Sequence, residues 1–175
     1  MPVDESIKLS DIVFLDMEAS GLGDCCFPIE IGFVAALDLS GWWSLIRPPP
    51  SWLRGKCWDA KAEGLHGLSL DEIHRDGSPV EDVAVALNRA LAGKQVFCDE
   101  PDFVRHWLSM VSEAARMHTN FELWHTQTLF LHWSRLVSYD APLQSDAPAK
   151  DLRRHRAYDD AYGLATGFRG LLSLP

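Results

Sequence analysis

Apolar runs near the amino terminus are short and rich in branched and aromatic residues, which is typical of buried strands. The first run covers residues 12–18 (IVFLDME), the second residues 29–37 and the third residues 42–48. Because turn residues separate consecutive runs, we expect three antiparallel strands joined in succession. The prolines at 48–50 lack the amide hydrogen that a strand needs, so the third strand ends there.

The remainder of the chain alternates helical spacing with short apolar runs. Short helical patterns cover residues 60–75, and residues 81–93 place apolar side chains at helical spacing before a terminal glycine. The later expected elements are a strand over 94–98, a helix beginning at Pro101, a strand over 121–125, a helix over 126–137, a loop over 139–151 and a final helix over about 156–172. This order predicts an α/β fold of ribonuclease H-like architecture. Its mixed five-stranded sheet has three antiparallel strands followed by parallel strands, flanked by helices.

Length and charge limit what such a protein can bind. The chain has 175 residues, 47% of them hydrophobic, so we expect a single domain over residues 1–175 with a core over about 11–172. Twenty-five acidic residues against 16 Lys and Arg leave a formal charge of −9. A general basic surface for long nucleic acid is therefore excluded, and a polyanion must be met locally or through metal ions.

The amino-terminal residues and the cysteines bear on the compartment in which the protein is expected to work. Residues 1–11 lack the basic-then-apolar pattern of a signal peptide, and no apolar run approaches the about 18 residues of a membrane span. We therefore expect a cytoplasmic protein. The adjacent Cys25 and Cys26, with Cys57 and Cys98, match neither a redox pair nor a zinc-ligand spacing, which favours buried free thiols over a disulfide framework or structural zinc.

Two carboxylates interrupt the first apolar run. Asp16 and Glu18 are two positions apart, so in a strand both side chains lie on one face. Burying two like charges raises at least one pKa unless a cation neutralises them, and oxygen-only ligands suit magnesium or manganese. The alternative is that the strand ends early and both acids are solvated at its tip.

A second group of candidate residues lies near the carboxy terminus. His155 stands at or just before the start of the last predicted helix, with Asp159 and Asp160 one turn further on. Histidine can accept a proton near neutral pH, which makes His155 a candidate general base. The alternative is a surface histidine beside acidic residues.

The sequences FLDMEASGL (14–22), IEIGFV (29–34) and HRAYDDA (155–161) together resemble the DEDDh family of 3'-to-5' exonucleases. In that family the first motif is Asp-x-Glu, often followed by Ser or Thr, Gly and Leu, and the last motif is His-x-Ala-x-x-Asp-Ala. The positions that fit are Asp16, Glu18, Gly21, Leu22, His155, Ala157, Asp160 and Ala161. The segment LHGLS (65–69) also resembles a connecting element of the family.

The middle motif of the family departs from this sequence. The family places an aspartate in the first turn of the helix after the fourth strand, where this chain has Val104. Asp99 and Asp102 are the available substitutes. Asp99 is favoured because a residue at the end of a strand faces the same sheet edge as Asp16, whereas Asp102 fits a helix cap.

The resemblance implies a metal-dependent 3'-to-5' exonuclease that acts on single-stranded nucleic acid with a free 3' end, either short RNA or single-stranded tails. Two divalent ions, Mg²⁺ with Mn²⁺ as a substitute, are implied by the family's mechanism. Asp16, Glu18 and Asp160 would hold one ion, Asp16 and Asp99 the other, and His155 would be the general base. By the spacing of the motif, Asp159 is a neighbour of the ligand, although a shift in helix phase would exchange it with Asp160.

The resemblance also implies a substrate-binding loop after the first motif. Ser20, Gly21 and Leu22 would contact the terminal nucleotide, with Leu22 against its base. His66 is a further substrate-binding candidate, with a structural role as its alternative. Family members are often dimers, which makes a homodimer an open expectation.

Two other functions stay open. Because Val104 occupies the middle motif, the chain could be a catalytically weakened exonuclease fold that binds nucleic acid ends or a protein partner. A metal-dependent phosphatase acting on a small phosphate ester is the second alternative.

Overall fold

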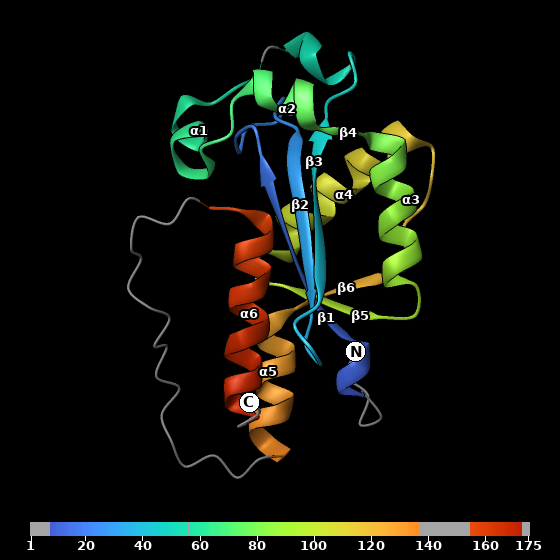
Figure 1. The fold of residues 1–175 in the computed structure, drawn as a ribbon, viewed down its shortest axis with the longest axis vertical. Helices are drawn as coiled ribbons and strands as arrows, with labels where there is room; N and C mark the ends of the chain where they lie inside the picture. Colours follow the sequence, from blue (N-terminus) through green and yellow to red (C-terminus); the bar gives the residue numbers. More distant parts are fainter. Residues whose placement is uncertain (1–7, 56, 137–154, 173–175) are drawn as a thin grey trace.

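The computed structural model describes residues 8–55, 57–136 and 155–172. Hairpin-connected strands come first and helices separate the later strands, as the sequence pattern predicted (Figure 1). The elements are η1 (Leu9–Asp11), β1 (Ile12–Ala19), β2 (Pro28–Ala35), β3 (Gly41–Arg47), η2 (Trp52–Gly55), α1 (Ala60–His66), α2 (Leu70–Asp76), β4 (Ser78–Pro79), α3 (Val80–Leu91), β5 (Gln95–Cys98), α4 (Pro101–Ala115), β6 (Glu122–His125), α5 (Thr126–Leu136) and α6 (Ala157–Leu171), where η denotes a 3-10 helix. No helix within the described ranges has the length and apolar character needed to cross a membrane. The loop expected over 139–151 lies outside the described residues.

The strands form one mixed sheet in the order β4-β3-β2-β1-β5-β6. The pairs β1–β2 and β2–β3 are antiparallel, whereas β1–β5, β5–β6 and β3–β4 are parallel. The predicted α/β class with a mixed sheet is therefore confirmed. The sheet has six strands rather than the five expected, because β4 adds a two-residue strand at the edge, which is too short to give a sequence period.

Alternation along β1 separates two hydrophobic cores. The odd-numbered apolar residues of β1 pack with α3 and α4, and these residues are Val13, Leu15 and Met17. The even-numbered Ile12 and Phe14 pack instead with Phe168 of α6. Figure 1 shows the helices covering both faces of the sheet. Because side chains alternate with a period of two, Asp16 and Glu18 extend the even-numbered face, which α6 covers.

Close contact between α6 and β2 depends on small residues. A Cβ atom on Gly32 would lie 2.5 Å from the backbone nitrogen of Tyr158, which is too close for any side chain. The side of α6 that faces the sheet is formed by fully buried alanines, namely Ala157, Ala161 and Ala165. The first turn of α6 therefore lies directly on the sheet, beside the end of β1.

The cysteines differ from the expectation of free thiols. Cys25 and Cys57 form a disulfide with their Cα atoms 5.5 Å apart, although 32 positions separate them in the sequence. Cys26 and Cys98 are free and buried, as expected. The prediction was wrong for Cys25 and Cys57, because their meeting depends on the segment before α1 folding back to the loop between β1 and β2.

Replacing Gly32 with alanine is expected to destabilise the protein. The added methyl group must displace the backbone of α6, and overpacking of this kind costs about 1–3 kcal/mol. Gly167 of the same helix has open space at its Cβ position, so Gly167→Ala should be neutral or stabilising by up to about 1 kcal/mol. Urea denaturation of both variants measures the two effects. Equal stability of the Gly32→Ala and wild-type proteins would contradict this packing of α6.

Candidate active site

Three acidic side chains lie on the face of the sheet that α6 covers. Glu18 of β1 is paired with Glu30 of β2, and Asp16 is paired with Gly32. Glu30 is 1% exposed, and it accepts hydrogen bonds from the guanidinium of Arg156 and from the backbone N–H of Ala157. Glu30 is thus a structural acid whose charge is neutralised within the protein. The carboxylates of Asp16 and Glu18 have no comparable partner among the described residues.

The two β1 carboxyl groups are strongly perturbed. Burial is the main cause that raises the pKa of Asp16 to about 8, and the negative charges of Asp160, Asp99 and Glu30 raise it further. Burial and the charge of Asp16 raise the pKa of Glu18 to about 8 as well. β1 continues to Ala19, so the strand does not end before Glu18, and both acidic residues are half-buried. Such a pair is ionised at neutral pH only if positive charge is supplied.

The start of α6 adds His155 and Asp160 to this group. The backbone N–H of His155 donates to the carbonyl of Leu65 at 3.0 Å, which fixes the chain just before the helix. His155 Nδ1 lies 3.6 Å from Asp160 Oδ2. One ligand atom each from Glu18, His155 and Asp160 lie within 4.8 Å of one another. Asp159 is exposed and lies outside that group.

The structure separates the two candidates for the middle carboxylate. Asp99 follows β5, accepts a hydrogen bond from the Thr126 hydroxyl and is near enough to raise the pKa of Asp16. The side chain of Asp102 is 97% exposed and pairs with Arg105. Val104 packs in the core between α4 and the opposite face of the sheet. The geometry therefore favours Asp99 and leaves Asp102 at the surface.

Thr126 is a site residue that sequence reasoning missed. It is 2% exposed, begins α5 directly after β6 and orients the Asp99 carboxylate through its hydroxyl. The sequence signal that could have found Thr126 is its position directly after β6. The parallel strands β5 and β6 end at the same edge of the sheet, so the residues that follow them lie close together. A threonine there also fits an ordinary helix start, so the sequence alone does not distinguish the two roles.

The loop after Glu18 is held by its own backbone and by Ser20. Ser20 is fully buried, its hydroxyl accepts from the N–H of Phe27 at 3.0 Å, and its carbonyl accepts from the N–H of Asp59 at 2.8 Å. A Cβ atom on Gly21 would lie 2.8 Å from the sulfur of Cys26, so only glycine fits there. Leu22 is 76% exposed. Ser20 and Gly21 thus shape the loop, and Leu22 is the apolar side chain that it presents.

His66 ends α1 in a buried position. It is 1% exposed, and its Nδ1 accepts a hydrogen bond from the N–H of Leu68 at 3.0 Å. Its Nε2 therefore carries the hydrogen, and this atom has no partner among the described residues. Burial lowers the pKa of His66, so the ring is neutral. The sequence alternatives of structural and substrate-binding roles both remain compatible with a ring that has one satisfied nitrogen.

The donor set fits a hard divalent cation. Carboxylate oxygens dominate it, and oxygen ligands are those that Mg²⁺ and Mn²⁺ prefer. Burial and mutual repulsion raise the pKa values of Asp16 and Glu18, and a nearby cation would favour the ionised form of both groups. Glu18 and Asp160, whose carboxylate oxygens lie within 4.8 Å of each other, could hold such an ion, with Asp16 near enough for its pKa to be raised by Asp160.

Comparisons with known proteins identify the fold. No protein-family model matches the chain, and no curated protein matches its sequence. Among solved structures, E. coli exonuclease I in complex with a dA16 oligonucleotide superposes with a TM-score of 0.66, 12% identity and 93% of this chain covered. Exonuclease I from Methylocaldum szegediense gives a TM-score of 0.65, 12% identity and 91% coverage.

The chain spans about 40% of the length of these exonuclease I chains. At this identity the likeness shows the fold alone. The chain therefore shares the fold of exonucleases, the class of enzyme that its sequence motifs resemble.

Stability should depend on pH and on divalent ions in a linked way. The pKa values of Asp16 and Glu18 lie near 8 in the folded protein, against ordinary values of 3.8 and 4.5. As the pH rises, the unfolded chain therefore loses these protons at a lower pH than the folded protein does. The free energy of unfolding of the metal-free protein should therefore fall between about pH 4 and pH 8. A fixed magnesium concentration, about 100 times the dissociation constant at pH 8, should raise Tm by about 5–10 °C at pH 8 and by less at pH 5, where protons compete for the carboxylates.

Thermal melts across this pH range, with and without magnesium, measure both effects. The Asp16→Asn, Glu18→Gln double variant is the control, because it removes both titrating groups and should flatten the pH dependence. A metal-free stability that rises from pH 5 to pH 8 would be the opposite result.

Proposed function

We propose that this protein is a metal-dependent 3'-to-5' exonuclease that hydrolyses the terminal phosphodiester bond of single-stranded nucleic acid. The observation that carries the proposal is the convergence of acids from three distant segments on one end of the sheet. Asp16 and Glu18 come from β1, Asp99 follows β5, and Asp160 comes with His155 from the start of α6. The exonuclease fold of the structural neighbours supports the same class of reaction.

The proposed ligands divide into two sets around Asp16. Glu18 and Asp160 would share one divalent ion with Asp16, whereas Asp99 would share a second ion with it. When bound, such ions supply positive charge at the scissile phosphate and at the attacking and leaving oxygens. Thr126 would keep the Asp99 carboxylate oriented, since its hydroxyl already donates to that group. Mg²⁺ is the proposed ion, with Mn²⁺ as a substitute.

His155 is the proposed general base. Its side chain is 54% exposed, so it can reach a water molecule in front of a bound phosphate. The Asp160 carboxylate at 3.6 Å would stabilise the imidazolium that forms when His155 Nε2 takes a proton. The hydrogen bond from its own N–H to Leu65 holds the residue at the mouth of the site. General base catalysis of this kind is worth about 10²- to 10⁴-fold.

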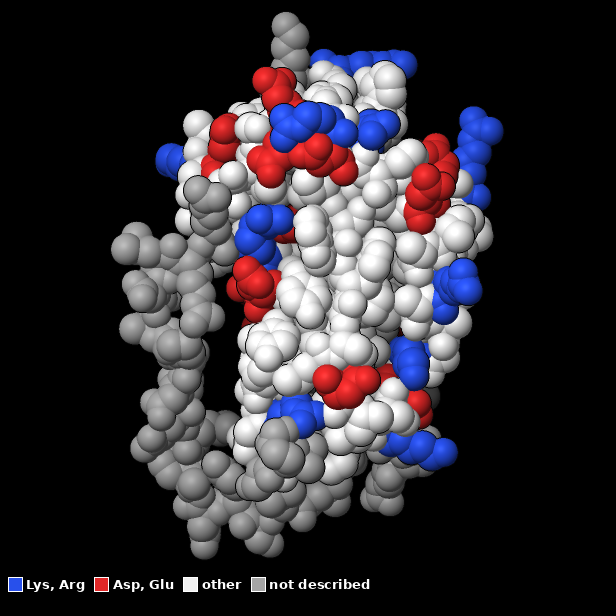
Figure 2. All heavy atoms as spheres, viewed as in Figure 1, with Lys and Arg blue, Asp and Glu red and all other residues white. Residues whose placement is uncertain are grey.

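Single-stranded substrates fit the surface best. On the face shown in Figure 2, the basic side chains of the described residues stand singly or in small groups among acidic ones. The formal charge of −9 disfavours long duplex DNA. The exposed Leu22, two positions after the buried Ser20, would make an apolar contact with the face of the terminal base, and such a contact does not depend on which base is present. We propose short RNA or single-stranded DNA tails as the substrates.

A weakened enzyme that binds nucleic acid ends is the second candidate. Val104 favours it, because the aspartate expected at that position is replaced by a core residue. The two candidates differ in whether Asp99 completes the site. They are distinguished by substitution of that residue.

Substitution of the proposed ligands should abolish exonuclease activity. Asp16→Asn removes the carboxylate shared by both ion sites, and Asp99→Asn removes the second set, so each should lower kcat by at least about 10²-fold. Asp102→Asn is the matched control, because that side chain is exposed and pairs with Arg105, and it should retain wild-type kcat. The rate at which a 5'-labelled single strand is shortened in the presence of magnesium provides the measurement. Activity unchanged in Asp99→Asn would remove Asp99 from the mechanism.

The direction and strand preference can be tested on matched oligonucleotides. We expect successive shortening of single-stranded RNA or DNA from its 3' end, with blunt duplex DNA cut at least about 10-fold more slowly. A 3'-phosphorothioate linkage should stop the reaction at the terminal bond. Products that begin at internal positions of the strand would be incompatible with an exonuclease.

A further inference from the structure

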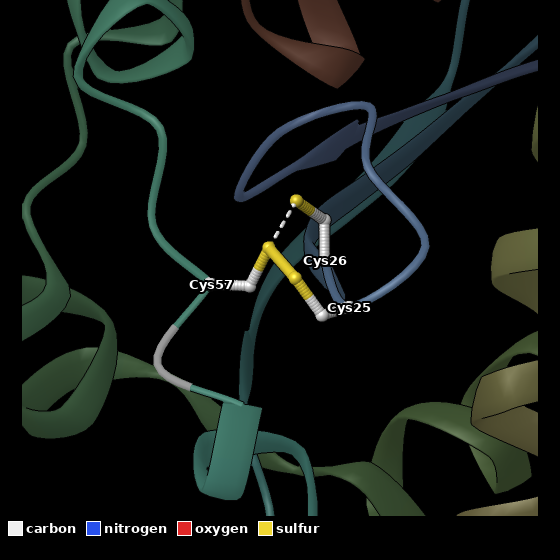
Figure 3. A group of neighbouring side chains, drawn as sticks. All are labelled: Cys25, Cys26 and Cys57. Carbon is white, nitrogen blue, oxygen red and sulfur yellow. Dashed lines mark hydrogen bonds between the residues drawn. A yellow bond between two sulfur atoms is a disulfide. The ribbon is translucent and has the colours of Figure 1, made fainter.

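Three cysteine side chains meet where the loop that follows Glu18 approaches the segment before α1 (Figure 3). Cys25 and Cys26 lie in the connection between β1 and β2, whereas Cys57 lies in the connection between η2 and α1. The three sulfur atoms all lie within 4.8 Å of one another. Two segments separated by about 30 positions therefore bring their sulfurs to one point.

One disulfide does not account for this arrangement. Cys25 and Cys57 are bonded, yet the buried Cys26 thiol also points at them, with its sulfur 2.8 Å from that of Cys57. A redox bridge needs two sulfurs, and the third has no role in it. Sulfur ligands at about 2.3 Å from a tetrahedral zinc ion lie about 3.8 Å from one another, which fits within the span of the cluster.

We propose that the reduced chain binds one zinc ion through the thiolates of Cys25, Cys26 and Cys57. The disulfide between Cys25 and Cys57 is then the oxidised, ion-free form of the same site. Reduction delivers two electrons and two protons to that bond and yields two thiols. Zinc binding next releases one proton from each of the three thiols, since the thiolate is the ligand. Cys25 is exposed, so water completes the coordination.

The site would hold α1 against the loop that follows Glu18. The backbone N–H of Asp59, two positions after Cys57, donates to the carbonyl of Ser20, and Gly21 lies against both Cys26 and Asp59. At its other end, α1 accepts the hydrogen bond from His155 through Leu65. One ion at the cysteine cluster would therefore fix the helix that contacts both the loop and the start of α6.

The zinc site is chemically distinct from the carboxylate site, and the inference does not rest on the proposed function. Soft thiolates select zinc, whereas carboxylate oxygens suit magnesium. A readout specific for sulfur ligands separates the two. Cobalt provides one, because cobalt bound to thiolates absorbs light by charge transfer from sulfur and cobalt bound to carboxylates does not.

The whole 175-residue chain is reduced with a phosphine, which takes an oxygen from water and becomes the phosphine oxide. The reduced protein is then transferred to an oxygen-free buffer. We expect one equivalent of cobalt to produce the sulfur charge-transfer absorption, and one equivalent of zinc to abolish it. Cys98→Ser is the matched control, because Cys98 is a buried free thiol outside the cluster, and it should behave as the wild type. Cys26→Ser and Cys57→Ser should lose the absorption and the zinc retained after gel filtration.

Protection from alkylation tests the site in the unmodified sequence, in case a variant fails to fold. Zinc should slow the alkylation of Cys25 in the reduced wild-type protein by at least about 10-fold, and chelation should restore the rate. The proposal is overturned if the reduced protein shows no sulfur charge-transfer absorption, or if Cys26→Ser keeps it. It is equally overturned if zinc binds without protecting Cys25. If Cys57 exchanges its disulfide partner from Cys25 to Cys26 and the reduced protein binds no zinc, the cluster is a site of thiol–disulfide exchange and the zinc proposal is overturned.

Discussion

The repulsion between acids that share one buried face of the sheet is the constraint on which this molecule depends. Glu30 is the acid whose charge the protein neutralises internally, through the guanidinium of Arg156. Asp16 and Glu18 are left with raised pKa values, and Asp160 shares that perturbation. Stable folding tolerates such crowding only with protons or bound cations. The same unfavourable interaction that weakens the metal-free fold would therefore favour the binding of divalent ions, as proposed above.

Packing and chemistry are linked through the first turn of α6. Gly32 and the buried alanines let this turn lie on the sheet, and Arg156 immediately before it reaches Glu30. The ion pair between Arg156 and Glu30 thus anchors the start of α6. The adjacent His155 and the first-turn residue Asp160 are positioned by the same anchor. A segment remote in sequence from β1 is positioned by contacts that need no metal, so the candidate site is largely formed by the fold itself.

Sequence patterns predicted most of this arrangement. Alternation in β1 placed Asp16 and Glu18 on one face, and the spacing of HRAYDDA placed His155 and Asp160 near a helix start. Three features could not be predicted from the sequence patterns. The two residues of β4 carry no period, the disulfide between Cys25 and Cys57 depends on a long-range return of the chain, and the Thr126 hydroxyl on Asp99 depends on where β6 ends. Local patterns encode faces and phases, whereas contacts between distant segments come from the tertiary structure.

The position of Val104 separates α4 from the chemistry of the site. Its side chain packs on the sheet face opposite to Asp16, while the nearby carboxylate of Asp99 is supplied by the end of a strand. A carboxylate directly after a strand is held by the last pair of the ladder, here Cys98 with His125, whereas a carboxylate on a helix moves with every rotation of that helix. A small rotation of α4 would therefore leave the spacing between Asp16 and Asp99 unchanged, although the buried side chains of α4 keep that helix packed against the sheet.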